Sequence, residues 1–249
     1  MAKRKKTIRA GSLVKTVLYT APEPHDCPRA RAEKTRATTA ARKRINDKTA
    51  KGRLEMLLAA NFGPEDEFVT LTYDDAHLPK SRKEAEENLK RWIRKLRPLW
   101  KKRGLVLRYV YVTENRHGDG RYHHHIMLTA LGGNDLETLC SLWPHGRDVE
   151  AQRTGSREFD QWAQYMAKES GDRPLGARMW VPSKGLQQPE VESCFVPDDT
   201  ALAVPPNCEV IEREEKVTEY GSYSYVKYRI LPPKSRGNRH GEMEKRPSW

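Results

Sequence analysis

Two strand-like segments joined by a short turn constrain the fold of this chain more than any other feature. Residues 105–114 contain the apolar run 109–112, and residues 123–131 return to an apolar composition after a turn at residues 115–120 that contains two glycines. Apolar segments separated by such a turn are typical of a β-hairpin. The chain is therefore expected to contain an antiparallel sheet.

Segments around this hairpin predict the remaining elements. Residues 81–103 form the clearest helix, because apolar residues recur there at spacings of three and four. Further strands are expected at residues 68–73 and 148–152, and further helices at 38–60, 135–143 and 156–170. This order of elements predicts an α+β fold, with helices packed on a central antiparallel sheet.

The composition points to a polyanionic partner. The 249 residues include 46 Lys and Arg against 34 Asp and Glu, which gives a net charge of +12, and only 37% are hydrophobic. So basic a chain favours nucleic acid over a membrane. The apolar stretches are strand-sized and the N-terminus lacks the apolar core of a secretion signal, so a cytoplasmic location is expected and no membrane contact.

The same pattern divides the chain into four parts. Residues 1–36 are expected to be a flexible basic arm, 37–62 a basic amphipathic helix, 63–192 the domain that contains the hairpin, and 193–249 a C-terminal extension. Within the extension, residues 209–214 and 220–231 predict a second hairpin, followed by a basic disordered tail. Its tyrosines alternate with Lys227 and Arg229, a pattern suited to stacking on single-stranded bases or, more commonly, to packing within the hairpin.

The first hairpin predicts a metal site. His123 and His125 project from one face of their strand, and an antiparallel return brings Glu114 beside them, at roughly 5 Å for directly opposed side chains. Two imidazoles and a carboxylate leave coordination positions open, as a catalytic metal requires. Mg²⁺ or Mn²⁺ is expected for phosphate chemistry, although histidine ligands also admit zinc. The alternative is a solvated histidine run, while His124 is expected on the packing face.

An ordered set of motifs resembles a known family. Residues 68–72, Glu114, residues 123–125 and residues 165–168 follow one another as do the motifs of rolling-circle replication initiators, the HUH endonucleases of phages and plasmids. The resemblance is closest to the compact phage and prophage type and extends over about residues 38–192. It departs from the family at His124, where an apolar residue is usual. It implies a ferredoxin-like, RRM-like sheet and an HUH nicking and joining domain at residues 63–192.

The resemblance also implies residue roles. Tyr165 is expected to attack DNA with help from Lys168 and to form a 5′-phosphotyrosyl link, while Glu114, His123 and His125 hold the metal. Tyr165 lies on the flank of the buried stripe of its helix, so an ordinary tyrosine at the edge of the core is the alternative. The candidate DNA contacts are Thr70, Thr72 and Arg121. Strand threonines and an exposed arginine without a DNA role are equally compatible with these three positions.

The expected activity is metal-dependent, site-specific nicking and rejoining of single-stranded DNA at a replication origin. The chain contains no Gly-x-x-x-x-Gly-Lys-Ser/Thr loop, so unwinding and synthesis are expected to depend on a host helicase and a host DNA polymerase. Two alternatives are a single-strand transposase or mobilisation relaxase with the same chemistry, and a non-catalytic module that binds single-stranded nucleic acid. The pattern leaves the oligomeric state and the origin sequence open.

Overall fold

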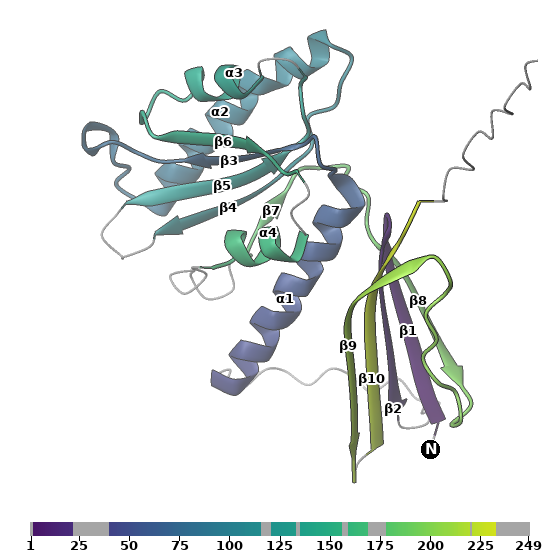
Figure 1. The fold of residues 1–249 in the computed structure, drawn as a ribbon. Helices are drawn as coiled ribbons and strands as arrows, with labels where there is room; N and C mark the ends of the chain where they lie inside the picture. The colour runs from purple at the N-terminus through teal and green to yellow at the C-terminus, as the bar shows by residue number, and fades with distance from the viewer. Residues whose placement is uncertain are drawn as a thin grey trace, which may run out of the picture.

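The protein is described by a computed structural model for residues 2–21, 40–115, 121–132, 135–155, 159–168, 178–219 and 221–232. These residues form four α-helices and two five-stranded antiparallel sheets. Figure 1 shows the sheets as two separate bodies with the long helix α1 (Ala40–Asn61) running between them. The predicted α+β class, with helices on an antiparallel sheet, is confirmed.

The first sheet, which we call the histidine sheet, contains the predicted hairpin and has the strand order β6-β3-β5-β4-β7. Its strands are β3 (Glu67–Leu71), β4 (Tyr109–Asn115), β5 (Tyr122–Leu128), β6 (Val149–Arg153) and β7 (Val181–Pro182). In the hairpin, Glu114 pairs with His123 and Val112 pairs with His125. The predicted turn at residues 116–120 lies outside the described residues.

One face of the histidine sheet is covered by α2 (Arg82–Lys102) and α3 (Asp135–Ser141), with the short 3-10 helix η1 (Asp75–His77) nearby in the chain. Ser81 caps α2 by accepting a hydrogen bond from the backbone N–H of Glu84, which satisfies one of the free donors at the helix start. Fully buried Trp92 and Trp100 fill the layer between α2 and the sheet. The predicted helix at 81–103 is confirmed to within a residue at each end.

The other face of the histidine sheet is covered by α1 and α4 (Phe159–Met166). Leu54 and Leu58 of α1 and Trp162 of α4 are buried against Phe68 and Met127 of the sheet. The sequence predicted a helix at 156–170, of which residues 156–158 and 169–170 lie outside the described residues. This packing places α4 directly over the strands that carry the histidines.

The second sheet, which we call the flanking sheet, has the strand order β8-β1-β2-β10-β9. Its strands are β1 (Ala2–Ala10), β2 (Leu13–Ala21), β8 (Glu190–Val196), β9 (Cys208–Thr218) and β10 (Gly221–Ile230). The β9–β10 hairpin lies where the sequence predicts one. Residues 233–249, where a tail was predicted, lie outside the described residues.

The expectation of a flexible arm at residues 1–36 is wrong for residues 2–21, which form the hairpin β1–β2. Its turn places Gly11 at φ +57°, a conformation that glycine adopts without steric cost. Val14, Thr16 and Leu18 of β2 are buried on one face, and β1 is paired on its other side with β8, whose residues come about 190 positions later. Residues 22–36 lie outside the described residues.

Helix α1 joins the two sheets because it is apolar on two sides. Whereas Leu54 and Leu58 contact the histidine sheet, Met56 packs against Ala10 and Leu13 at the β1–β2 turn. Among the described residues, no helix is both long enough and apolar enough to cross a membrane.

Candidate active site

The β4–β5 hairpin brings Glu114 and His125 together. Their strand positions share the face covered by α1 and α4, and His125 Nε2 lies 3.5 Å from Glu114 Oε2. Both residues are buried, with 4% of Glu114 and 9% of His125 exposed. The antiparallel ladder itself therefore fixes a carboxylate and an imidazole side by side.

Thr70 sets the orientation of the His125 ring. β3 pairs with β5 so that Thr70 lies directly opposite His125, and its Oγ1 is 3.3 Å from His125 Nδ1. A partner on one ring nitrogen fixes the ring and leaves the other nitrogen for a ligand. In this geometry Nε2 is the nitrogen that faces Glu114.

His123 completes the set of predicted donors on this face. It pairs directly with Glu114 in the hairpin and is half-buried. The donor types, two imidazoles and one carboxylate, fit a divalent cation, and two of them already lie within 4 Å. In the parts of the chain that the structure describes, no three His, Cys, Asp or Glu side chains form a cluster that could hold a metal ion.

Tyr165 lies over the histidine face. Its ring centroid is 5.0 Å from that of His125 and 5.6 Å from that of Phe68, and 42% of the residue is exposed. The position follows from α4, whose buried Trp162 and Met166 anchor the helix on the sheet and turn Tyr165 towards its edge. A phenol that is both accessible to solvent and next to His125 is suited to meet a ligand held there.

The other predicted site residues lie around this centre. Lys168 is exposed just after α4, and its backbone N–H donates to the carbonyl oxygen of Tyr165. Thr72 donates through its hydroxyl to the carbonyl oxygen of Asp148. Arg121 is exposed and forms an ion pair with Asp75. The structure therefore gives a clear contact within the centre only to Thr70 among the three predicted DNA contacts.

His124 has the packing role expected from its face. It is fully buried between the hydroxyl groups of Tyr73 and Thr113, each 2.9 Å from a ring nitrogen. Burial lowers the pKa of His124 to about 3, aided by the neighbouring His125 and His123. The ring is therefore neutral and serves the core rather than the metal face.

The sequence did not indicate two further features. Phe68 stacks on the His125 ring at 5.9 Å and on Trp162 at 4.3 Å, which joins strand, histidine and helix in one aromatic group. Its place on the same strand face as Thr70 was readable from alternation. Glu67 and Asp135 also form a buried carboxyl pair bound to Arg153, and their separation of 68 positions leaves no local pattern.

The fold and the site together have the features of a replication protein that acts on DNA: an antiparallel sheet, a carboxylate and histidines on one face, and a tyrosine on a helix above them. Residues 66–170 match the family model of the replication-associated proteins of the ORF2 type, and this region belongs to that family. The matched region runs from β3 to the end of α4 and contains Glu114, His123, His125 and Tyr165. Comparison with curated proteins and with solved structures found no match.

Proposed function

We propose that this protein initiates rolling-circle replication through one reaction, the nicking and rejoining of a single DNA strand at an origin. The observation that carries the proposal is the approach of Tyr165 to His125, which itself lies beside Glu114. The match of residues 66–170 to replication-associated proteins supports the same reaction and favours an initiator over a transposase or relaxase with similar chemistry.

In this proposal Glu114, His123 and His125 hold Mg²⁺ or Mn²⁺ next to the scissile phosphate. When bound, the ion polarises the phosphate and offsets the charge that develops in the transition state. Thr70 keeps His125 Nε2 directed at the site. Thr72 and Arg121 are proposed to contact the DNA backbone on either side.

Tyr165 supplies the nucleophile. Its phenolic oxygen forms a bond to phosphorus, the bond from phosphorus to the 3′-oxygen breaks, and the phenolic proton passes to solvent while the 3′-oxygen gains one. The products are a 5′-phosphotyrosyl link and a free 3′-hydroxyl that a host polymerase extends behind a host helicase. Because the link is an ester, attack by a 3′-hydroxyl rejoins the strand without ATP. Lys168, exposed within a turn of Tyr165, is proposed to stabilise the attacked phosphate.

The test is to trap the covalent intermediate. Purified protein is incubated with Mn²⁺ and labelled single-stranded oligonucleotides that tile the DNA flanking the gene, and adducts are resolved under denaturing conditions. The wild type and Tyr109→Phe are expected to form the adduct, whereas Tyr165→Phe is not. Tyr109 is the matched control because it lies in the same hairpin but is packed against Tyr111.

Three outcomes separate the possible functions. An adduct that persists in Tyr165→Phe would show that another residue is the nucleophile. Single-strand binding with no adduct under Mg²⁺, Mn²⁺ or Zn²⁺ would support a non-catalytic binding module instead. An adduct that depends on Tyr165 but not on added metal, even after chelation, would contradict the role of Glu114 and the histidines.

A further inference from the structure

A second concave surface lies between α1 and the flanking sheet, outside the region that matches the family for most of its extent. It is a cleft of about 1480 Å³, lined by the strands β1, β2, β9 and β10, by α1, and by α4 at Gln164. Pockets for small ligands occupy roughly 300–1,000 Å³, so a cleft of this size fits a segment of a polymer better. Gln164 is next in the sequence to Tyr165.

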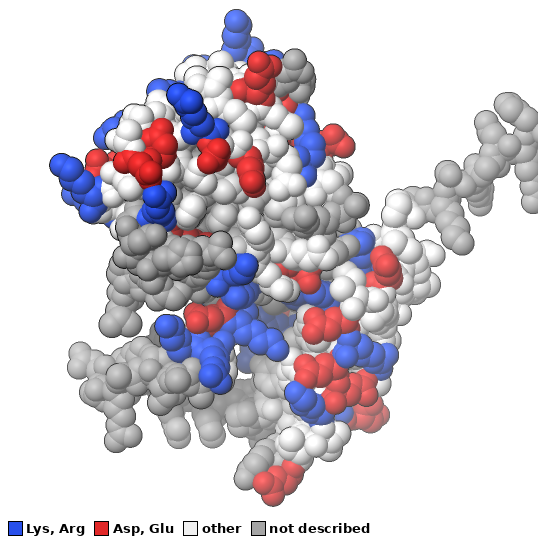
Figure 2. Space-filling model, turned by 60° about the vertical axis from the view of Figure 1, so that its left-hand side comes forward, with Lys and Arg blue, Asp and Glu red and all other residues white. Residues whose placement is uncertain are grey.

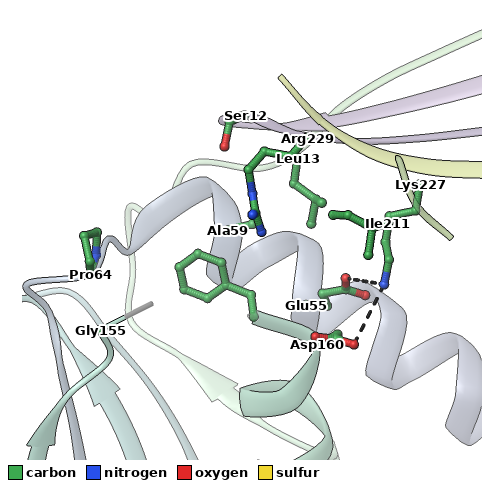
Figure 3. A pocket seen from close by; sticks show the side chains of 11 residues that line it. Ser12, Leu13, Glu55, Ala59, Pro64, Gly155, Asp160, Ile211, Lys227 and Arg229 are labelled. Atoms are coloured by element: carbon green, nitrogen blue, oxygen red, sulfur yellow. Dashed lines mark hydrogen bonds and ion pairs between the residues drawn. The ribbon is translucent and has the colours of Figure 1, made fainter. Parts of the chain in front are cut away.

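The charge of the cleft differs between its two ends. At the closed end, Glu55 is held by Lys15 and Lys227, and Lys227 also lies 3.9 Å from Asp160, so charges there largely cancel. Figure 3 shows this junction, with dashed lines from Lys227 to Glu55 and Asp160. It closes the cleft between α1 and the sheet.

The open end is basic. Arg44, Lys48 and Lys51 line it from α1, and Lys6 lines it from β1. Glu214, which also lines the cleft, pairs with Lys216 at 2.5 Å and so offsets little of this charge. Figure 2 shows Lys and Arg side chains gathered between the two bodies on the face in view. A run of cations along a cleft is the feature that follows a phosphate backbone.

Aromatic side chains face these cations from the sheet. Tyr223 and Tyr225 of β10 line the same cleft, and 37% of Tyr223 is exposed. They occupy alternate positions of one strand, so both point to the α1 side, where Tyr225 is paired with Val17. Exposed tyrosines opposite lysines and arginines form a surface on which unpaired bases stack while phosphates are held.

We propose that this cleft binds a segment of single-stranded DNA, with phosphates along α1 and bases against Tyr223 and Tyr225. The strand then leads towards α4, where Gln164 adjoins Tyr165. The proposal deepens the proposed function, since it assigns to the flanking sheet the holding of the DNA strand on which Tyr165 acts. Duplex DNA fits less well because its bases are stacked and paired and leave the tyrosines without partners.

The experiment measures binding alone, in a Tyr165→Phe background that cannot form the proposed link. Fluorescence anisotropy with a labelled 20-nucleotide single strand, over a series of salt concentrations, compares two triple variants. The cleft variant is Arg44→Ala, Lys48→Ala, Lys51→Ala. The control is Lys90→Ala, Arg94→Ala, Arg97→Ala, which removes the same charge from exposed positions of α2.

The cleft variant is expected to bind at least about tenfold more weakly, with a salt slope smaller by about 2, since each lost phosphate contact on a single strand contributes about 0.7. The control variant is expected to keep the slope of the parent. Equal losses in the two variants would overturn the proposal, because net charge alone would then explain binding.

The aromatic part has its own test. Tyr223→Ala is expected to weaken single-strand binding by roughly fivefold or more, and Tyr223→Phe to keep it, because stacking needs the ring and not the hydroxyl. Unchanged binding in Tyr223→Ala, or a duplex bound as tightly as the single strand, would overturn the proposal. These results stand whether or not the Tyr165 adduct is found, so failure of the cleft and failure of the nicking reaction are distinguishable.

Discussion

The two sheets of this protein have the same number of strands and opposite surfaces. The histidine sheet is covered on both faces, and every residue of its strand β3 is buried. In the flanking sheet, by contrast, β8 and β9 are exposed over almost their whole length. The difference indicates a division of labour, in which the buried sheet fixes a few side chains precisely in place and the open sheet offers area for contact.

The sheets meet at one charged junction. Lys227 of β10 contacts Glu55 of α1 and lies near Asp160 of α4, and α4 is also the helix that carries Tyr165. The open sheet is thus attached to the same helix as the proposed nucleophile. Variants that act on one sheet and spare the other test whether this division holds.

The largest effect is expected at the metal face of the histidine sheet. His125→Ala removes a proposed ligand, and adduct formation is expected to fall by about a thousandfold, because a bound ion contributes several kcal/mol to phosphate chemistry. The assay is the yield of covalent adduct at fixed time with Mn²⁺. Lys216→Ala on exposed β9 is the control and is expected to react as the wild type does. A His125→Ala protein with normal yield would remove the histidine face from the reaction.

The next effect is on stability. Trp92→Ala empties a fully buried site under the histidine sheet and is expected to lower the free energy of unfolding by about 3–5 kcal/mol. Val217→Ala, at a position of β9 that is 85% exposed, is expected to change it by less than about 0.5 kcal/mol. Urea unfolding followed by circular dichroism measures both. Similar losses in the two variants would contradict the contrast between a covered and an open sheet.

The same contrast explains what the sequence could predict. The elements of the histidine sheet were found because burial on two faces imposes alternation on strands and a three- to four-residue period on α2. The neighbourhood of Glu114 and the histidines followed from hairpin register. β1 was missed because its exposed positions hold Lys and Arg, and its partner β8 follows about 190 residues later, beyond any local pattern.

Within the site, the limits were of the same kind. Thr70 was predicted to contact DNA, and its position opposite His125 became visible only from the pairing of β3 with β5, two strands separated by more than 50 residues. The approach of Tyr165 to His125 likewise depends on how α4 packs against the sheet. Periodicity placed Tyr165 at the edge of its helix, but it could not show which strand lay beneath.

A smaller loss of stability is expected at the junction. Glu55 is 6% exposed and accepts from both Lys15 and Lys227, so Glu55→Gln leaves two lysines without their shared counter-charge. We expect a loss of about 2–3 kcal/mol, towards the lower end of the range for breaking a buried ion pair because Lys227 keeps Asp160 and Glu212 nearby. Lys227→Met is expected to lose less, since Lys15 still pairs with Glu55. The reverse order in urea unfolding would contradict this account.

The smallest effect is a dependence on pH that arises in the histidine sheet. Burial, together with the hydrogen bond and charge of Asp135, raises the pKa of Glu67 from 4.5 to about 9. Between these values the folded protein keeps a proton that the unfolded chain has lost, so this contribution is complete below pH 4.5 and disappears as the pH rises to 9. The free energy of unfolding should therefore fall in that window by up to about 1.4 kcal/mol for each pH unit.

Glu67→Gln mimics the protonated side chain and is expected to flatten this dependence, as measured by urea unfolding at several pH values from about 6 to 9. Glu214→Gln in the flanking sheet is the matched control. The Lys216 ammonium lowers the pKa of the exposed Glu214 carboxyl, so this group is already ionised throughout the window and its removal leaves the slope unchanged. A slope that persists in Glu67→Gln would place the titrating group elsewhere and would show that alkaline sensitivity does not distinguish the covered sheet from the open one.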